Sequence, residues 1–142
     1  MSIAMNANQP YVEHEPKAPH QEPGTRLKQD GLSDGERNVS IFMHLLPLIL
    51  APIGAGPFAF LGPLVLWAIQ KDKSAFNDDH GREVMNFMIS MVLLSIILCI
   101  TIIGIPFILV LWIMGIVNMI RGAIAASNGE YFRYPFTWRF IS

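Results

Sequence analysis

Two long stretches of the chain contain no charged side chain. They cover residues 38–70 and 84–120, and neither holds an Asp, Glu, Lys or Arg. Apolar runs of about 18 residues or more are typical of segments that cross a membrane, whereas the helices of a soluble protein carry a polar face. Charged residues make up only 15% of the whole chain, against roughly 25% in soluble domains. The pattern therefore predicts an all-α integral membrane protein.

Each stretch is too long for one membrane helix and is broken near its centre. As a single helix, the first stretch would measure roughly 50 Å, against a hydrocarbon layer of about 30 Å. Its middle reads APIGAGP (51–57), and the second stretch is interrupted by TIIGIP (101–106). Pro and Gly at this density end a helix. The breaks predict two helical hairpins, with four membrane helices at about 38–51, 58–71, 78–103 and 106–126.

The basic residues indicate which side of the membrane the loops face. All ten Lys and Arg lie in the first 37 residues, in 71–82, or from Arg121 onward. Two hairpins place these three regions on one side of the membrane, whereas three spans, with 41–70 as one helix, would separate them. Because Lys and Arg favour the cytoplasmic side, we expect four segments with both termini cytoplasmic.

These features divide the chain into three parts. Residues 1–35 are rich in proline and poor in apolar clusters, which predicts a disordered cytoplasmic tail. A four-helix membrane domain follows at 36–128, and an aromatic-rich interfacial segment at 129–142. The first two helices are short, so the hairpin 38–71 either spans the bilayer fully or is re-entrant, and the sequence leaves both open.

In the C-terminal segment every second residue is aromatic: Phe132, Tyr134, Phe136, Trp138 and Phe140. An extended chain would carry these rings on one face, with Arg133 and Arg139 on the other. Aromatic and Arg side chains together are typical of the headgroup layer. They also occur in proteins that bind single-stranded nucleic acid. The segment follows a membrane helix directly and the net charge is −1, so we expect no nucleic-acid partner.

Three motifs predict helix ends. SDGE (33–36) has the form of a capping box just before the first apolar stretch. The side chains of NDD (77–79) are of the types that cap a helix N-terminus. Gly129 is placed to end the last helix.

Of the polar side chains within the apolar stretches, four are candidates for a common site: His44, Asn86, Ser90 and Asn118. Their positions along the predicted helices put them at similar depth, so we expect an intramembrane polar cluster on the cytoplasmic side. Two interpretations remain open. The cluster supplies hydrogen bonds between helices, worth about 0.6 kcal/mol each, or it lines a polar pathway or contacts a substrate.

The stretch NDDHGREVMNF (77–87) raises the question of a metal or catalytic site. Asp78, Asp79, His80 and Glu83 are common metal ligands, but their spacing fixes no coordination geometry. Acid–base catalysis would also need a nucleophile and an oxyanion donor, and neither is evident nearby. We therefore expect no metal, no cofactor and no enzymatic activity.

Four blocks of the sequence carry a family resemblance: HLLPLI (44–49), GPLVLWAIQKDKSAFNDDHGREVMNFMIS (62–90), IIGIP (102–106) and AIAASNGEYFRYPFTWRFI (123–141). Together, over about 36–141, they resemble a bacterial family of small membrane proteins of unknown function. That family is distantly similar to the twenty-kilodalton component of the chloroplast inner-envelope translocon. The motif residues are Asp79, His80, Gly81, Glu83, Asn86, Phe87, Tyr134 and Pro135. Met88 departs from the family, which often has Gln there.

The resemblance implies a multi-pass protein of the cytoplasmic (inner) membrane of a bacterium, without a known activity. We expect a non-catalytic scaffold or assembly subunit of a membrane complex. The alternative is a subunit of a small transporter or channel. The expected partner is the lipid bilayer, together with either further copies of the chain or other membrane proteins. The plastid relative suggests protein translocation only by remote analogy.

Overall fold

The structure is a computed structural model, and it describes residues 18–101 and 104–142. Within these ranges, four α-helices follow one another: α1 (Asp34–Leu50), α2 (Leu61–Gln70), α3 (Ala75–Ile100) and α4 (Ile105–Ser127). A π-helical turn, Ala51–Ala55, and a 3-10 helix, Gly56–Phe60, join α1 to α2. The described part of the chain contains isolated β-bridges but no β-strand, so the predicted all-α class is confirmed.

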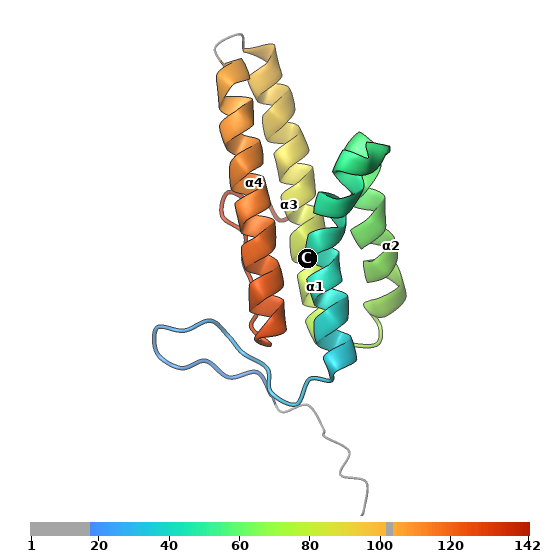
Figure 1. Cartoon of the computed structure of the whole chain (residues 1–142). Helices are drawn as coiled ribbons and strands as arrows, with labels where there is room; N and C mark the ends of the chain where they lie inside the picture. Colours follow the sequence, from blue (N-terminus) through green and yellow to red (C-terminus); the bar gives the residue numbers. More distant parts are fainter. Residues whose placement is uncertain (1–17, 102–103) are drawn as a thin grey trace, which may run out of the picture.

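The helices form two antiparallel hairpins that lie side by side (Figure 1). The hairpin of α3 and α4 extends further than that of α1 and α2 at the end opposite to residues 18–33. α1 packs against α2, α3 and α4, so it holds the two hairpins together.

The first hairpin turns where the sequence predicts a break. Gly54 has a φ of 100°, a left-handed conformation that glycine adopts without strain, and it interrupts the helical path that begins with α1. The second hairpin turns between Ile100 and Ile105, with Thr101 already extended. Residues 102 and 103 of the predicted bend lie outside the described residues.

Two of the predicted helix ends are confirmed. Ser33 Oγ accepts a hydrogen bond from the Glu36 N–H at 3.2 Å, and the Glu36 carboxylate accepts one from the Ser33 N–H at 2.9 Å. This capping box starts α1 at Asp34, earlier than the predicted residue 38. At the end of α4, Gly129 has a φ of 73° and closes the last turn.

The prediction that residues 77–79 cap the third helix is wrong. Ser74 is the N-cap of α3, because its side chain accepts a hydrogen bond from the Asn77 N–H. Residues 77–79 therefore lie in the first turns of α3. Their side chains bind other parts of the fold; Asn77, for example, accepts a hydrogen bond from Ser40 of α1 at 2.8 Å.

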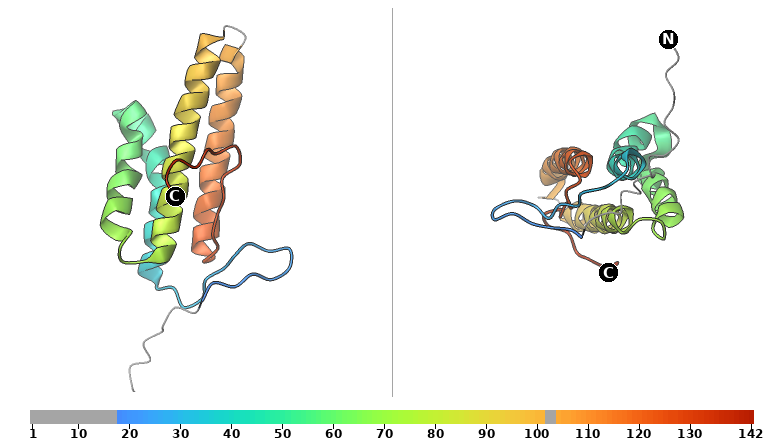
Figure 2. Two further views of the ribbon diagram at one scale, coloured as in Figure 1. Left: turned by 180° about the vertical axis from the view of Figure 1, so that it is seen from behind. Right: turned by 90° about the horizontal axis from the view of Figure 1, so that it is seen from below.

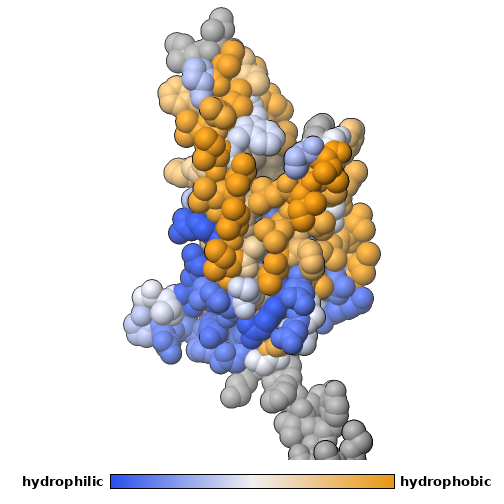
Figure 3. Space-filling model, viewed as in Figure 1, coloured by the Kyte–Doolittle hydropathy of each residue, from blue (hydrophilic) through white to orange (hydrophobic). Residues whose placement is uncertain are grey.

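The surface of the protein divides into an apolar and a polar region. Figure 3 shows hydrophobic side chains along the helices and hydrophilic ones at the end where residues 18–33 lie. In the part of the chain that the structure describes, three helical stretches are long and apolar enough to cross a membrane: Asp34–Ala55, Ala75–Ile100 and Ile105–Ser127. The fourth, Phe58–Gln70, is shorter. These are the properties of a membrane protein with one short helix.

Residues 18–33 lie against the chain that follows α4. The Tyr131 N–H donates to the Leu27 carbonyl at 2.8 Å, and the Gln29 N–H donates to the Gly129 carbonyl at 2.9 Å. Leu32 is 8% exposed. Of the tail predicted at 1–35, residues 1–17 lie outside the described residues. In the remainder, residues 18–28 are exposed, Gln29 and Leu32 are buried, and the chain then runs into α1.

Gly81 allows α2 to approach α3 closely. A Cβ atom at this position would lie 2.2 Å from Cδ1 of Trp67, a side chain of α2. The same indole donates a hydrogen bond from Nε1 to Asp78 at 2.8 Å. The contact between α2 and α3 therefore depends on the absence of a side chain at residue 81.

We expect Gly81→Ala to destabilise the protein by about 1–3 kcal/mol, because the added methyl group overlaps the Trp67 ring. Reversible unfolding in detergent, followed by circular dichroism, measures the effect. Gly35→Ala is the matched control, since a Cβ there meets only Ser33 Oγ, at 3.8 Å. The control should be neutral or stabilising by up to about 1 kcal/mol. Equal stability of the two variants would contradict the packing described.

Candidate functional site

The C-terminal segment, residues 129–142, returns along the long hairpin. In the left view of Figure 2 it runs beside α4 and then crosses to α3, where the chain ends. Beyond Tyr131 the segment has no helical or sheet hydrogen bonds among the described residues, so its backbone needs other partners, above all beside apolar surfaces. Polar side chains of α3 supply those partners.

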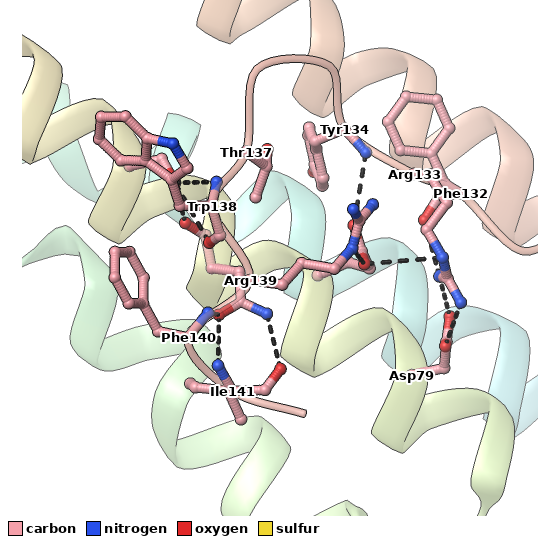
Figure 4. A network of polar contacts seen from close by, with 12 residues as sticks. Asp79, Phe132, Arg133, Tyr134, Thr137, Trp138, Arg139, Phe140 and Ile141 are labelled. Carbon is pink, nitrogen blue, oxygen red and sulfur yellow. Dashed lines mark hydrogen bonds and ion pairs between the residues drawn. The ribbon is translucent and has the colours of Figure 1, made fainter.

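Three hydrogen bonds hold the end of this segment at Phe140 and Ile141 (Figure 4), and Asn86 is the partner in all three. Its Oδ1 accepts from the backbone N–H groups of Phe140 and Ile141, at 2.9 and 2.8 Å. Its Nδ2 donates to the Ile141 carbonyl at 2.9 Å. Ser90 Oγ accepts from the Trp138 N–H at 2.8 Å. Asn86 and Ser90 are each 1% exposed, so the segment itself covers them.

Glu83 is a buried carboxylate that two arginines of the C-terminal segment neutralise. It is 4% exposed, and its Oε1 accepts from Arg139 Nε at 2.8 Å and lies 3.6 Å from Arg133 Nε. Arg133 also donates to both carboxylate oxygens of Asp79, at 2.6 and 2.7 Å. These hydrogen bonds raise the pKa of Arg133 above its ordinary value. A buried charge is tolerated only when paired, so Glu83 and the segment stabilise each other.

A row of buried hydrogen bonds joins α1, α3 and the C-terminal segment. The Tyr134 hydroxyl lies 2.5 Å from His44 Nδ1, and His44 Nε2 lies 2.8 Å from His80 Nδ1. His80 Nε2 in turn lies 3.1 Å from the Glu130 carbonyl oxygen. His44 and His80 are both fully buried.

With both imidazoles neutral, the Glu130 carbonyl at one end determines which atom donates in each of these hydrogen bonds. A carbonyl oxygen only accepts, so His80 Nε2 carries the hydrogen and its Nδ1 accepts from His44 Nε2. His44 Nδ1 then accepts from the Tyr134 hydroxyl. Burial, together with the charge of Glu83, raises the pKa of Tyr134 well above 10, which keeps the phenol in its donating form.

Gly122 of α4 leaves room for this row. A Cβ atom there would lie 2.6 Å from His44 Nδ1 and 3.0 Å from the Tyr134 hydroxyl. Gly115, also on α4, similarly faces Met91 of α3. These small residues therefore serve packing within the chain.

The alternating aromatic residues do not form one face. Phe132 and Tyr134 are buried, at 3% exposure each, whereas Phe136 is 76% exposed. The reason is a turn at Pro135 and Phe136, where Phe136 takes a φ of 56° and ends the extended conformation. Beyond the turn, Trp138 is exposed again.

The four polar residues predicted to cluster are all buried, between 0% and 3% exposed: His44, Asn86, Ser90 and Asn118. They belong to three separate arrangements. His44 lies in the row with Tyr134, Asn86 and Ser90 hold the C-terminal segment, and Asn118 donates to the Met114 carbonyl of its own helix at 2.9 Å.

The motif residues of α3 gather around the C-terminal segment. Asp79, Glu83 and Asn86 bind it directly, and the Phe87 ring stacks on Tyr134 with 4.1 Å between centroids. Gly81 instead faces α2, and Pro135 lies exposed in the turn.

Sequence reasoning missed that one face of α3 binds the end of the chain. Glu83, Asn86 and Ser90 are spaced by three and four residues, which puts them on one helix face. That spacing, together with two arginines in a segment without helix signals, is the pattern that would have indicated the contact.

Within the described ranges, no group of three or more His, Cys, Asp or Glu side chains is arranged to hold a metal ion. The acidic and imidazole residues of α3 have separate partners. Asp78 binds Trp67 and Arg82, whereas Asp79 binds Arg133.

We expect Asn86→Ala to release the end of the C-terminal segment, because the amides of Phe140 and Ile141 lose their acceptor. Hydrogen exchange of these two amides, followed by NMR in detergent, should accelerate about tenfold or more. Asn118→Ala is the control, since Asn118 has no hydrogen bond to the segment among the described residues. Unchanged protection in Asn86→Ala would refute the role of Asn86.

Comparison with known proteins gives one match. The family described as the magnetosome magnetite crystal formation protein family (MamF and MmsF) matches residues 35–141. No curated protein and no solved structure matches the chain. The match supports the expected small bacterial membrane-protein family, but it gives no link to the chloroplast translocon. The matched range begins at the second residue of α1 and includes the other three helices and the C-terminal segment up to Ile141. The chain belongs to the magnetosome magnetite crystal formation protein family.

Proposed function

We propose that the protein is a non-catalytic, multi-pass membrane subunit that supports the assembly of a membrane complex. From its family, we further propose that this complex acts in the formation of magnetite crystals. The membrane is the cytoplasmic (inner) membrane of a bacterium or a compartment derived from it, and both termini lie on the cytoplasmic side.

One observation carries the assembly role. In the part of the chain that the structure describes, every buried side-chain nitrogen or oxygen has a hydrogen-bond partner within the protein. The polar groups that most resemble a site, Asn86, Ser90 and Glu83, are occupied by the C-terminal segment. A polar group used in this way stabilises the fold and is not available to a substrate.

The same observation weighs against a small transporter or channel. A conducting path needs polar side chains that face water along its length. His44 and Asn86 face protein instead. The channel remains the alternative, and the accessibility of these two positions to water distinguishes it from a scaffold.

Cysteines introduced at positions 44 and 86, in a Cys99→Ser background, provide that test in spheroplasts. We expect neither to react with a membrane-impermeant maleimide, even after the cells are opened. A cysteine at Lys73, in the exposed turn before α3, is the control. It should react only in opened cells, because we place this turn on the cytoplasmic side. Reaction at positions 44 and 86 would favour a wet pathway, and reaction of residue 73 in intact spheroplasts would overturn the topology.

The role in magnetite formation is tested by deleting the gene in a bacterium that makes magnetite. We expect crystals of altered size or number, seen by electron microscopy, and rescue by the full chain. A chain ending at Asn128 should not rescue, because α3 would then expose the buried carboxylate of Glu83. Arg82→Gln is the control for rescue, since Arg82 binds only Asp78 on the same helix among the described residues. Unaltered crystals in the deletion strain would contradict the proposed role.

A further inference from the structure

A cavity of about 530 Å³ opens beside α4 at the polar end of the bundle. Its walls come from three parts of the chain: the loop at 21–27, α4, and the C-terminal segment between Tyr131 and Pro135. The volume lies within the range of roughly 300–1,000 Å³ that is usual for ligand sites. The proposed assembly role does not use this cavity.

The charged side chains that line the cavity are all positive. Arg26, Arg121 and Arg133 line it, and none of its described lining residues is acidic. Two of these arginines pair with acidic residues that do not line the cavity. Arg133 binds Asp79, and Arg26 Nη1 lies 3.2 Å from Glu130.

Arg121 differs from the other two. Within the described ranges it has no hydrogen bond and no ion pair, and its side chain is exposed. Its full charge therefore faces the cavity without compensation. Among the described residues, Arg26 uses only Nη1 in a hydrogen bond, which leaves its other N–H groups for a second partner.

Arg121 lies at the border between the apolar and polar surfaces. It is six residues before the end of α4 at Ser127, which is about 9 Å by helical rise. Ile120 and Ile124, its neighbours on α4, are 44% and 54% exposed and belong to the apolar surface. Long Arg side chains at this depth reach the headgroup layer with their charged end.

The cavity wall also offers neutral hydrogen-bond groups. Asn118 is 3% exposed and uses one N–H for the Met114 carbonyl, which leaves a second N–H and the amide oxygen. Thr25 adds a hydroxyl. A ligand that carries hydroxyl groups next to its negative charge could therefore form hydrogen bonds with Asn118 and Thr25 beside Arg121.

We propose that this cavity binds a phosphate group, with Arg121 and Arg26 as its main partners. Guanidinium groups match the geometry of phosphate oxygens, and basic pockets at the cytoplasmic ends of membrane helices are typical sites for anionic headgroups. The position favours the headgroup of a phospholipid, because its acyl chains would lie along Ile113 and Val117, which precede Arg121 on α4 and are 54% and 49% exposed. Free phosphate shares the chemistry and is the second source that the test must distinguish.

The test measures thermal unfolding of the full-length protein in a neutral detergent at constant ionic strength. Phosphatidylglycerol, phosphatidylcholine and inorganic phosphate are titrated separately. A ligand that binds only the folded state stabilises it by RT ln(1 + [L]/Kd), so the rise of the melting temperature with ligand concentration yields an apparent Kd. We expect phosphatidylglycerol to raise the melting temperature in this way and phosphatidylcholine to leave it unchanged. Arg121→Gln and Arg26→Gln should each weaken the binding by about tenfold or more.

Lys73→Gln is the matched control, because it removes one positive charge at the same end of the bundle but outside the cavity. It should leave the apparent Kd unchanged, and all three variants should unfold normally without ligand. Saturable binding of inorganic phosphate that Arg121→Gln weakens would support the site with free phosphate as its ligand. The proposal is overturned if no anionic ligand binds, or if Arg121→Gln and Lys73→Gln weaken binding equally.

Discussion

The structure depends on the hydrogen bonds that side chains of α3 make with the irregular backbone of the C-terminal segment. Peptide groups beside an apolar surface are costly when they lack hydrogen bonds, and helices and closed sheets are the usual solutions. Here Asn86 and Ser90 replace a neighbouring strand by binding three backbone N–H groups of the C-terminal segment. The same side chains would be unfavourable in this helix if they faced lipid. The helix and the segment therefore depend on each other, and neither is stable in its observed position alone.

The row of Tyr134, His44 and His80 extends this dependence to the first hairpin. α1 contributes one imidazole, α3 the other, and the C-terminal segment the phenol and the terminal carbonyl. Each imidazole donates through one nitrogen and accepts through the other, the phenol donates and the carbonyl accepts, so replacing one of these side chains leaves its partner without a hydrogen bond in the interior. Gly122 makes the row possible by bringing α4 next to it. Polar bonds thus fix the relative position of helices whose apolar surfaces alone would specify it poorly.

The sequence predicts the helical class and the two bends because these follow from local chemistry. Gly and Pro at the density found in 51–57 disfavour a continuous helix, and the capping box at 33–36 is complete within four residues. The candidate site is different, because its contacts join residues far apart in the chain. His44 and Tyr134 are an example, and no spacing rule relates them. The alternation of aromatic residues led to the wrong prediction of a single aromatic face. The turn at Phe136 separates the buried rings of Phe132 and Tyr134 from the exposed rings that follow.

The unequal hairpins have a consequence for the surrounding lipid. α2 contains ten residues, about 15 Å of helix, and stands beside α3 with twenty-six. Lipid next to α2 must thin or tilt to match it, at a cost of fractions of a kcal/mol per ångström of mismatch. Lipid next to α4 meets no such mismatch, so the deformation is confined to one flank of the protein. A membrane that is already thin or strongly curved lowers this cost, and the chain is therefore expected to concentrate where the bilayer bends.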